Sequence, residues 1–141
     1  MSSLWPDGFQ ERKIRTPNEI LEEQGKYLPK LTGDLVHASI ETVSQVDPIV
    51  WVGDLKGDFI YSFSIKGKLV PKYRYIILYF AYNVEIYPLK IFLHDDQIVK
   101  ELQIENRLNI NNEDEFITVV KQIFNSERLK HVIGSILTLS K

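Results

Sequence analysis

Residues 59–92 read FIYSFSIKGKLVPKYRYIILYFAYNVEIYPLKIF and hold ten of the sixteen aromatic residues of the chain. Side chains in a β-strand point alternately to the two faces of a sheet, so a period of two indicates strands. From Phe59 to Lys66 apolar residues alternate with mostly hydroxylic ones, which predicts one apolar face and one water-facing row. From Tyr73 to Tyr82 both rows are bulky, so this strand is either covered on both sides or presents a binding surface.

Further strands are expected on both sides of this stretch, together with a long connection. The expected strands cover residues 35–43, 58–66, 72–82, 84–94 and 98–104, and 44–57 is the connection, with a short buried piece at 49–52. Pro88 cannot donate to a ladder, so strand 84–94 is expected at an edge or bulged there.

Helices are expected before the first strand and after the last strand in the sequence. Thr16 is a predicted N-cap, with Pro17 at the first helical position and Glu19 as the capping-box acid of a helix that runs to about Tyr27 or Leu28. A second cap at Asn111–Glu115 and a restart at Asn125-Ser126 predict two C-terminal helices. The last helix carries a continuous apolar stripe, formed by Leu129, Val132, Ile133, Ile136 and Leu137.

These patterns predict a single α+β domain over residues 16–141, preceded by an irregular arm at 1–15. Its parts are an N-terminal helix, a mostly antiparallel sheet of four to five strands, and two C-terminal helices packed on one sheet face. The chain has no cysteine, no signal-peptide pattern, and a longest apolar run of seven residues, Ile76–Tyr82, against the roughly 20 that a spanning helix needs. We therefore expect a cytoplasmic protein with no membrane contact.

Catalytic motifs are absent from the sequence, which favours a protein that is not an enzyme and has no cofactor. His94-Asp95-Asp96 is the one local cluster with chemistry, because a histidine and two carboxylates can bind a divalent cation or activate water. A metal-dependent hydrolase centred there is the alternative function. Aspartates directly after a strand are, however, ordinary turn residues.

Four basic residues near a hairpin are candidates for anion binding, namely Lys66, Lys68, Lys72 and Arg74. Basic and aromatic residues interleave on surfaces that bind single-stranded nucleic acid, which is the second alternative function. Alternation places Lys72 and Arg74 on the face opposite Tyr73 and Tyr75, and acidic segments flank the hairpin. Nucleic acid is therefore the less favoured partner.

The tyrosines Tyr73, Tyr75 and Tyr79 are the candidate protein interface, because alternation puts them in one row. Tyrosine suits both a helix-covered sheet margin and a protein interface, so core and interface remain open. We expect the other row, Ile76, Leu78 and Phe80, to be buried under the helices. The predicted function is a small non-enzymatic interaction module that uses this aromatic face to bind or sequester a partner protein or to homodimerise.

Overall fold

The structure is a computed structural model that describes residues 2–141, so Met1 of the expected arm lies outside the described residues. Residues 2–15 form neither helix nor strand. The elements that follow are, in chain order, α1 (Pro17–Gly25), α2 (Tyr27–Leu31), β1 (Val36–Thr42), α3 (Pro48–Val52), β2 (Phe59–Gly67), β3 (Val70–Tyr82), β4 (Leu89–Phe92), α4 (Asp96–Leu102), β5 (Arg107–Ile110), α5 (Glu113–Phe124) and α6 (Glu127–Leu139).

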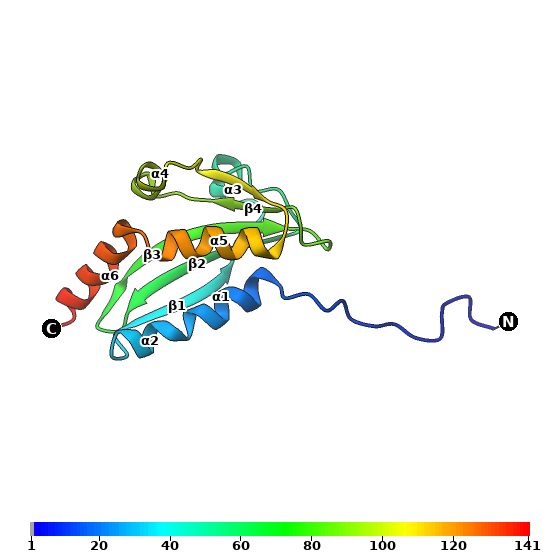
Figure 1. Cartoon of the computed structure of the whole chain (residues 1–141), viewed down its shortest axis with the longest axis horizontal. Helices are drawn as coiled ribbons and strands as arrows, with labels where there is room; N and C mark the ends of the chain where they lie inside the picture. The colour runs from blue at the N-terminus through cyan, green and yellow to red at the C-terminus, as the bar shows by residue number, and fades with distance from the viewer. Residues whose placement is uncertain (1) are drawn as a thin grey trace.

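The strands form one open antiparallel sheet in which each strand pairs with its neighbours in the sequence, in the order β1-β2-β3-β4-β5. Helices α1, α2, α5 and α6 lie over one face of this sheet (Figure 1). The predicted α+β class is confirmed, as are the N-terminal helix, the antiparallel sheet and the two C-terminal helices on one sheet face.

The main core fills the space between the sheet and these four helices, and Ile98 of α4 is buried in it as well. Strand β1 contributes Val36, Ala38 and Ile40 to it, as alternation predicts. The aromatic side chains of Phe63, Phe80 and Phe116 are fully buried there. Burial on this scale in a single layer supplies the main free energy that holds the fold together.

The predicted helix starts are confirmed in atomic detail. The Thr16 side chain accepts a hydrogen bond from the Glu19 backbone, and the Glu19 carboxylate accepts one from the Thr16 backbone, which completes a capping box with Pro17 at the first helical position. The side chains of Asn112 and Ser126 likewise accept backbone hydrogen bonds at the starts of α5 and α6. Local side-chain chemistry alone therefore places three of the helix starts.

A second, smaller core lies on the other face of the sheet, under α3. It joins Leu55, Ile60, Ala81 and Phe92. The expectation of a short buried piece at 49–52 is wrong, because Asp47 caps a short helix there and Trp51 is 83% exposed. Leu55, beyond the helix, is the fully buried residue of this segment.

Two expected strands differ in the structure. Most of residues 98–104 belong to helix α4 and not to a strand, because Asp95 caps a helix by accepting from the Gln97 backbone. The outermost strand is β5, at 107–110. The expected strand 84–94 shortens to β4, and Pro88 directly precedes it, so the missing donor removes no ladder bond and β4 is not an edge strand.

A bulge in β3 changes which of its side chains share a face. Phe63 of β2 lies opposite Leu78, but the next residue, Ser64, lies opposite Ile76. Ile77 is thus an extra residue in β3, and it is buried on the helix-covered face among the main core residues.

The bulge separates Tyr79 from Tyr75. Tyr75 lies opposite Ile65 and faces the helices, whereas Tyr79 lies opposite Ser62 and faces the other side. The prediction that Tyr73, Tyr75 and Tyr79 form one row is therefore wrong, because strict alternation does not survive an extra residue.

The expected buried row changes for the same reason. Leu78 and Phe80 are fully buried under the helices, as predicted. Ile76 instead lies opposite Ser64, on the other face, and is only half-buried. The part of the expectation that concerns Ile76 is wrong.

Within residues 2–141, no helix combines the length and the hydropathy needed to cross a membrane.

Substitution of two glycines by alanine should change the free energy of unfolding in opposite directions, because only one of the two positions has room for a Cβ. Gly134 in α6 has no atom within 4 Å of a built Cβ, so Gly134→Ala should raise the free energy of unfolding, by about 0.5–1 kcal/mol. At Gly57 a Cβ would lie 2.9 Å from the backbone N and O of Tyr82, so Gly57→Ala should lower the same quantity by about 1–3 kcal/mol. Urea unfolding measures both. Equal effects of the two substitutions would contradict the packing described.

Candidate protein-binding groove

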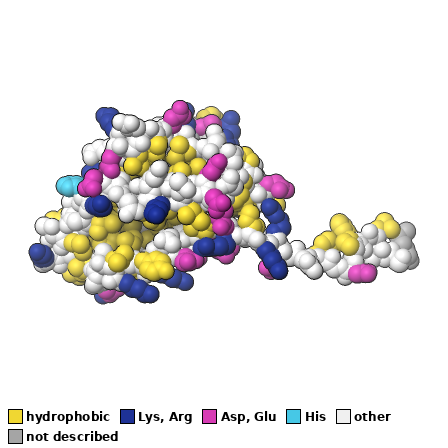
Figure 2. All heavy atoms as spheres, viewed as in Figure 1, with side chains coloured by type: hydrophobic (Ala, Val, Ile, Leu, Met, Phe, Trp, Pro, Cys, Tyr) yellow, Lys and Arg dark blue, Asp and Glu magenta, His cyan; other side chains and the backbone are white. Residues whose placement is uncertain are grey.

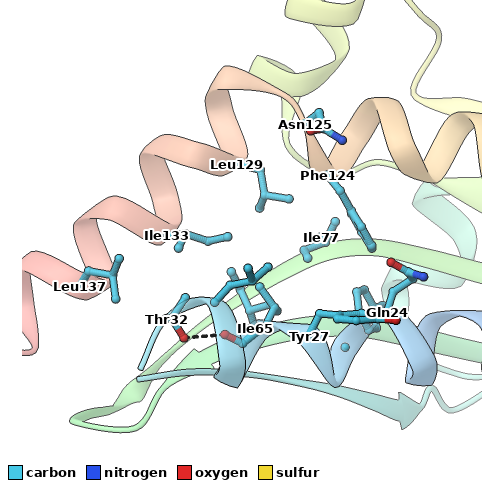
Figure 3. A pocket seen from close by; sticks show the side chains of 14 residues that line it. Gln24, Tyr27, Thr32, Ile65, Ile77, Phe124, Asn125, Leu129, Ile133 and Leu137 are labelled. Carbon is cyan, nitrogen blue, oxygen red and sulfur yellow. Dashed lines mark hydrogen bonds between the residues drawn. The ribbon is translucent and has the colours of Figure 1, made fainter. Parts of the chain in front are cut away.

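An apolar groove of about 430 Å³ opens between α6 and the pair α1 and α2. The sheet forms its floor through Phe63, Ile65 and Ile77, and Phe124 and Asn125 at the end of α5 close one end (Figure 3). In the space-filling view hydrophobic side chains gather in the hollow between α6 and α2 (Figure 2). Ligand sites of proteins typically enclose about 300–1,000 Å³, so the groove is of functional size.

One wall of the groove belongs to α6. Leu129, Ile133 and Leu137 recur every four residues, which places them along one line of a helix. The predicted apolar stripe is only partly core: Val132 and Ile136 are buried, whereas Ile133 and Leu137 are half-buried and border the groove. The stripe therefore serves both the core and this opening.

The opposite wall belongs to α1 and α2, and two of its large apolar side chains are exposed to solvent. Leu31 is 79% exposed and Tyr27 is 50% exposed, with the half-buried Leu28 between them. Contiguous apolar surface of this kind marks interaction sites more often than single exposed residues do.

Polar chemistry in the groove is limited. The Thr32 hydroxyl donates to the Leu28 carbonyl over 2.7 Å and accepts from the Val36 backbone over 3.0 Å, so it is already paired. The Asn125 amide donates to the Lys121 carbonyl. Among the fourteen lining residues Tyr27 alone is titratable. The groove thus offers apolar contact and has no group placed for acid–base or metal chemistry.

The N-terminal end of α6 is held in place by α4. Both oxygens of the Glu101 carboxylate accept backbone hydrogen bonds, from Glu127 over 2.7 Å and from Arg128 over 2.9 Å. A carboxylate at a helix N-terminus also interacts favourably with the helix dipole. This anchoring fixes the direction of α6 and therefore the position of the groove wall.

Asp95 strengthens the same anchor. Its carboxylate accepts from Arg128 Nε over 2.8 Å and from the Tyr75 hydroxyl over 2.6 Å. Burial alone raises the pKa of the Asp95 carboxyl, but the hydrogen bonds from Arg128, Tyr75 and the Gln97 backbone outweigh it, so the pKa lies below its ordinary value. Burial and the Asp95 carboxylate raise the pKa of Tyr75, which keeps its hydroxyl a donor.

The structure does not assemble the predicted metal cluster around Asp95. His94 is exposed and packs edge-on against Phe92, and Asp96 lies in the first turn of α4. Among residues 2–141 no group of three histidine, cysteine or carboxylate side chains is arranged to hold a metal ion. The Asp95 oxygens already have three donors, so these contacts give the hydrolase function no support.

The predicted basic residues are largely paired with acids. Lys68 Nζ lies 2.7 Å from the Asp34 carboxylate. Arg74 lies 3.4 Å from Glu41, which is also 4.0 Å from Lys66. Lys72 has no ionic partner within the described part of the chain. Most of the positive charge expected to attract an anion is therefore neutralised locally.

Arg74 also covers part of the sheet. Its guanidinium donates to the hydroxyls of Ser64 over 3.1 Å and Ser62 over 3.0 Å. Both serines are buried, so the expectation that this row faces water is wrong. An arginine that lies along a strand can shield hydroxyl groups while its own charge stays near solvent.

The three tyrosines occupy different environments. Tyr73 is exposed, and Tyr75 is bound to Asp95. Tyr79 stacks on Phe92 beside α3, with ring centroids 6.2 Å apart. Tyr75 and Tyr79 project to opposite faces of the sheet, yet all three tyrosines border one open hollow of the surface, which His94, Asp95 and Asp96 also line. A role of each residue in an interface remains a prediction.

Sequence patterns miss the groove because it lies between elements that are distant in the chain. One local signal exists: Tyr27 and Leu31 lie four residues apart on a short helix, just where the sequence predicts the end of the N-terminal helix. Residues at this spacing lie on one face of a helix, and a contiguous exposed apolar patch is a signal of an interaction site.

Comparison of the chain with protein-family models, with curated proteins and with solved structures finds no match.

The Asp95 anchor makes a pH-dependent prediction. Asp95→Asn should lower the free energy of unfolding at pH 7 by about 1–3 kcal/mol, because charged hydrogen bonds are lost. Since the folded-state pKa is lowered, the stabilisation is complete above the ordinary carboxyl pKa of about 4 and is lost as pH falls through the folded value. The difference between wild type and variant should therefore shrink below about pH 4. Urea unfolding between pH 7 and pH 2 measures it.

Asp96→Asn is the matched control, because Asp96 is the neighbouring acid and has no partner in this network. Its effect should be only a few tenths of a kcal/mol, from the helix dipole. A gap between wild type and Asp95→Asn that stays constant through the acid range would contradict the assigned hydrogen bonds.

Proposed function

We propose that this protein is a non-enzymatic interaction module that binds a short apolar segment of a polypeptide in the groove between α6 and the α1–α2 pair. The observation that carries the proposal is the open apolar groove beside Leu31 and Leu137, on a sheet face that is otherwise covered by helices. This groove takes the place of the aromatic sheet face as the proposed binding surface.

The composition of the groove supports a polypeptide occupant. Its walls supply rows of apolar side chains on two helices, and two of its few polar side chains, Thr32 and Asn125, are hydrogen-bonded within the chain. Recognition of an apolar strand or helix laid between two helices needs this arrangement. Each apolar side chain that becomes fully buried contributes about 1.5–3 kcal/mol. Three such anchors contribute about 4.5–9 kcal/mol before the cost of ordering the segment is subtracted. A dissociation constant of 1 μM needs about 8.2 kcal/mol, so micromolar affinity is the upper limit expected for such a segment.

Metal-dependent hydrolysis and nucleic-acid binding have no comparable support. The Asp95 carboxylate is bound to Tyr75 and Arg128, and the basic residues Lys68 and Arg74 are paired with acids. We propose the cytoplasm as the location, because a chain without cysteine is compatible with a reducing compartment.

A peptide selection tests this function. Random 12-residue peptides displayed on phage are selected on the immobilised protein, and binding is measured by fluorescence polarisation. Peptides with repeated apolar anchors should be enriched. Leu31→Lys and Leu137→Lys should each weaken their binding by about 30-fold or more, as the loss of a central apolar contact does.

Leu139→Lys is the matched control, because Leu139 lies on the same last turn of α6, is exposed, and does not line the groove. It should leave peptide affinity unchanged, and thermal unfolding should show that all three variants are folded. Selected peptides that bind the Leu31→Lys and Leu137→Lys variants as tightly as wild type would overturn the proposed function.

A further inference from the structure

The segment before α1 is an arm with three large apolar side chains that the domain leaves uncovered. Leu4 is 92% exposed, and Trp5 and Phe9 are each 76% exposed. Trp5 and Phe9 touch one another edge-on, with ring centroids 6.2 Å apart. The arm runs from the start of α1 away from the folded domain (Figure 1), with hydrophobic side chains near its far end (Figure 2).

Local contacts fix the direction in which the arm leaves the domain. Ile14 packs against the core, and Arg15 pairs with Glu23 over 2.6 Å. Thr16 is extended, with φ −76° and ψ 156°, as a residue before proline must be. The arm therefore departs from the N-terminal end of α1.

The groove lies toward the opposite end of the same helix. Gln24 and Gly25, at the C-terminal end of α1, are the first groove residues, and α2 continues the wall. The arm of one copy thus points away from that copy's groove, which favours a second molecule as the place where the arm binds.

We infer that the arm of one copy docks in the groove of a second copy, and that the exchange is reciprocal, giving a symmetric dimer. The inference rests on the proposed function, because it names the occupant of that groove. Trp5, Phe9 and Leu4 are the anchors, and Leu31, Ile133 and Leu137 are among the groove residues that receive them. Closed two-fold exchange of identical segments is a common route to homodimers.

The dimensions allow this exchange. The fourteen residues from Ser2 to Arg15 span up to about 46 Å when extended. A domain of this size has a radius of gyration of about 14 Å, so the arm can cross to a neighbour. The Trp5 and Phe9 side chains of both copies, each burying about 150–250 Å², together with the groove surface they cover, reach the roughly 1,200–2,000 Å² of a stable interface.

Sedimentation across a concentration series tests the inference on the full chain. The arm variant carries Leu4→Ser, Trp5→Ser and Phe9→Ser, and the groove variant carries Leu31→Lys and Leu137→Lys. Wild type should dimerise, and each variant should raise the dimer dissociation constant by at least about 30-fold. The control variant Val46→Ser with Trp51→Ser removes apolar residues that are as exposed but lie elsewhere, and it should dimerise like wild type.

Mixing the variants separates arm exchange from other dimers. The arm variant keeps its groove and the groove variant keeps its arm, so an equimolar mixture should form a heterodimer with one intact arm–groove contact. Neither variant alone should do so at that concentration. A mixture that remains monomeric would overturn the inference, because it contains one intact arm and one intact groove and these should pair.

Trp5 reports directly on where the arm lies. Trp5 and Trp51 are the two tryptophans of the chain, so Trp51→Phe leaves Trp5 as the sole emitter. Its emission should shift to the blue, and acrylamide should quench it less, as dimer forms. A monomer in which Trp5 is shielded at every concentration means that the arm docks on its own domain. A dimer in which Trp5 stays fully quenchable means that another surface pairs. Either result overturns the inference.

A synthetic peptide of residues 2–15 distinguishes failure of this inference from failure of the proposed function. The peptide should bind the arm variant, whose groove no arm occupies, and should not bind when Leu31→Lys and Leu137→Lys are added. If this peptide does not bind but display-selected peptides still do, the arm is not the occupant and the groove function stands. If neither binds, both proposals fail.

Discussion

One extra residue in β3 determines how the helix-covered face of this sheet is arranged. The bulge at Ile77 places that side chain in the floor of the groove and leaves Tyr75 on the same face as the helices. From there the Tyr75 hydroxyl reaches the Asp95 carboxylate, which in turn binds Arg128 of α6. Without the extra residue, side chains would alternate strictly along the whole of β3, and Tyr75 would lie on the same face as Tyr79. The Asp95 carboxylate, which binds Arg128 at the start of α6, would then lose the hydrogen bond from Tyr75. A local irregularity of the strand is thus transmitted to the position of a helix.

The fixed position of α6 explains why a groove remains between it and α2. Helix α6 is held at its N-terminal end by Glu101 and Asp95, which act through short charge-assisted hydrogen bonds. Along its length it follows the sheet, while α2 lies across the gap with Leu31 exposed. The groove is therefore the space that two well-anchored helical units leave between them, and its residues come from four parts of the chain. A site that is formed before its ligand arrives loses little conformational entropy when it is filled.

Features that depend on short-range chemistry can be predicted from the sequence. Helix caps and the 3.6-residue stripe locate α1, α5 and α6, and alternation locates β1, β2 and β3.

Prediction from the sequence fails where contacts between distant parts of the chain determine the structure. The bulge at Ile77 arises from register with β2, so strict alternation gives Tyr79 the wrong face. Helix α4 escapes prediction because its apolar residues resemble a short strand, and an aspartate such as Asp95 serves equally well in a turn or as a cap. Local sequence patterns cannot predict the groove, because Ile133 and Ile136 belong to the same apolar stripe although only Ile136 is buried.

Arm exchange places the side chains of one copy against the groove methyl groups of the other, and that contact can be observed directly. The decisive measurement is an isotope-filtered nuclear Overhauser experiment on a mixed dimer, with one copy carrying ¹³C-labelled methyl groups and the other unlabelled. If the groove between α6 and α2 receives the arm, intermolecular cross-peaks should connect the methyls of Ile77 and Ile133 to the ring protons of Trp5 and Phe9. Cross-peaks that instead connect methyls outside the groove, such as those of Val46, to the partner copy would contradict arm exchange.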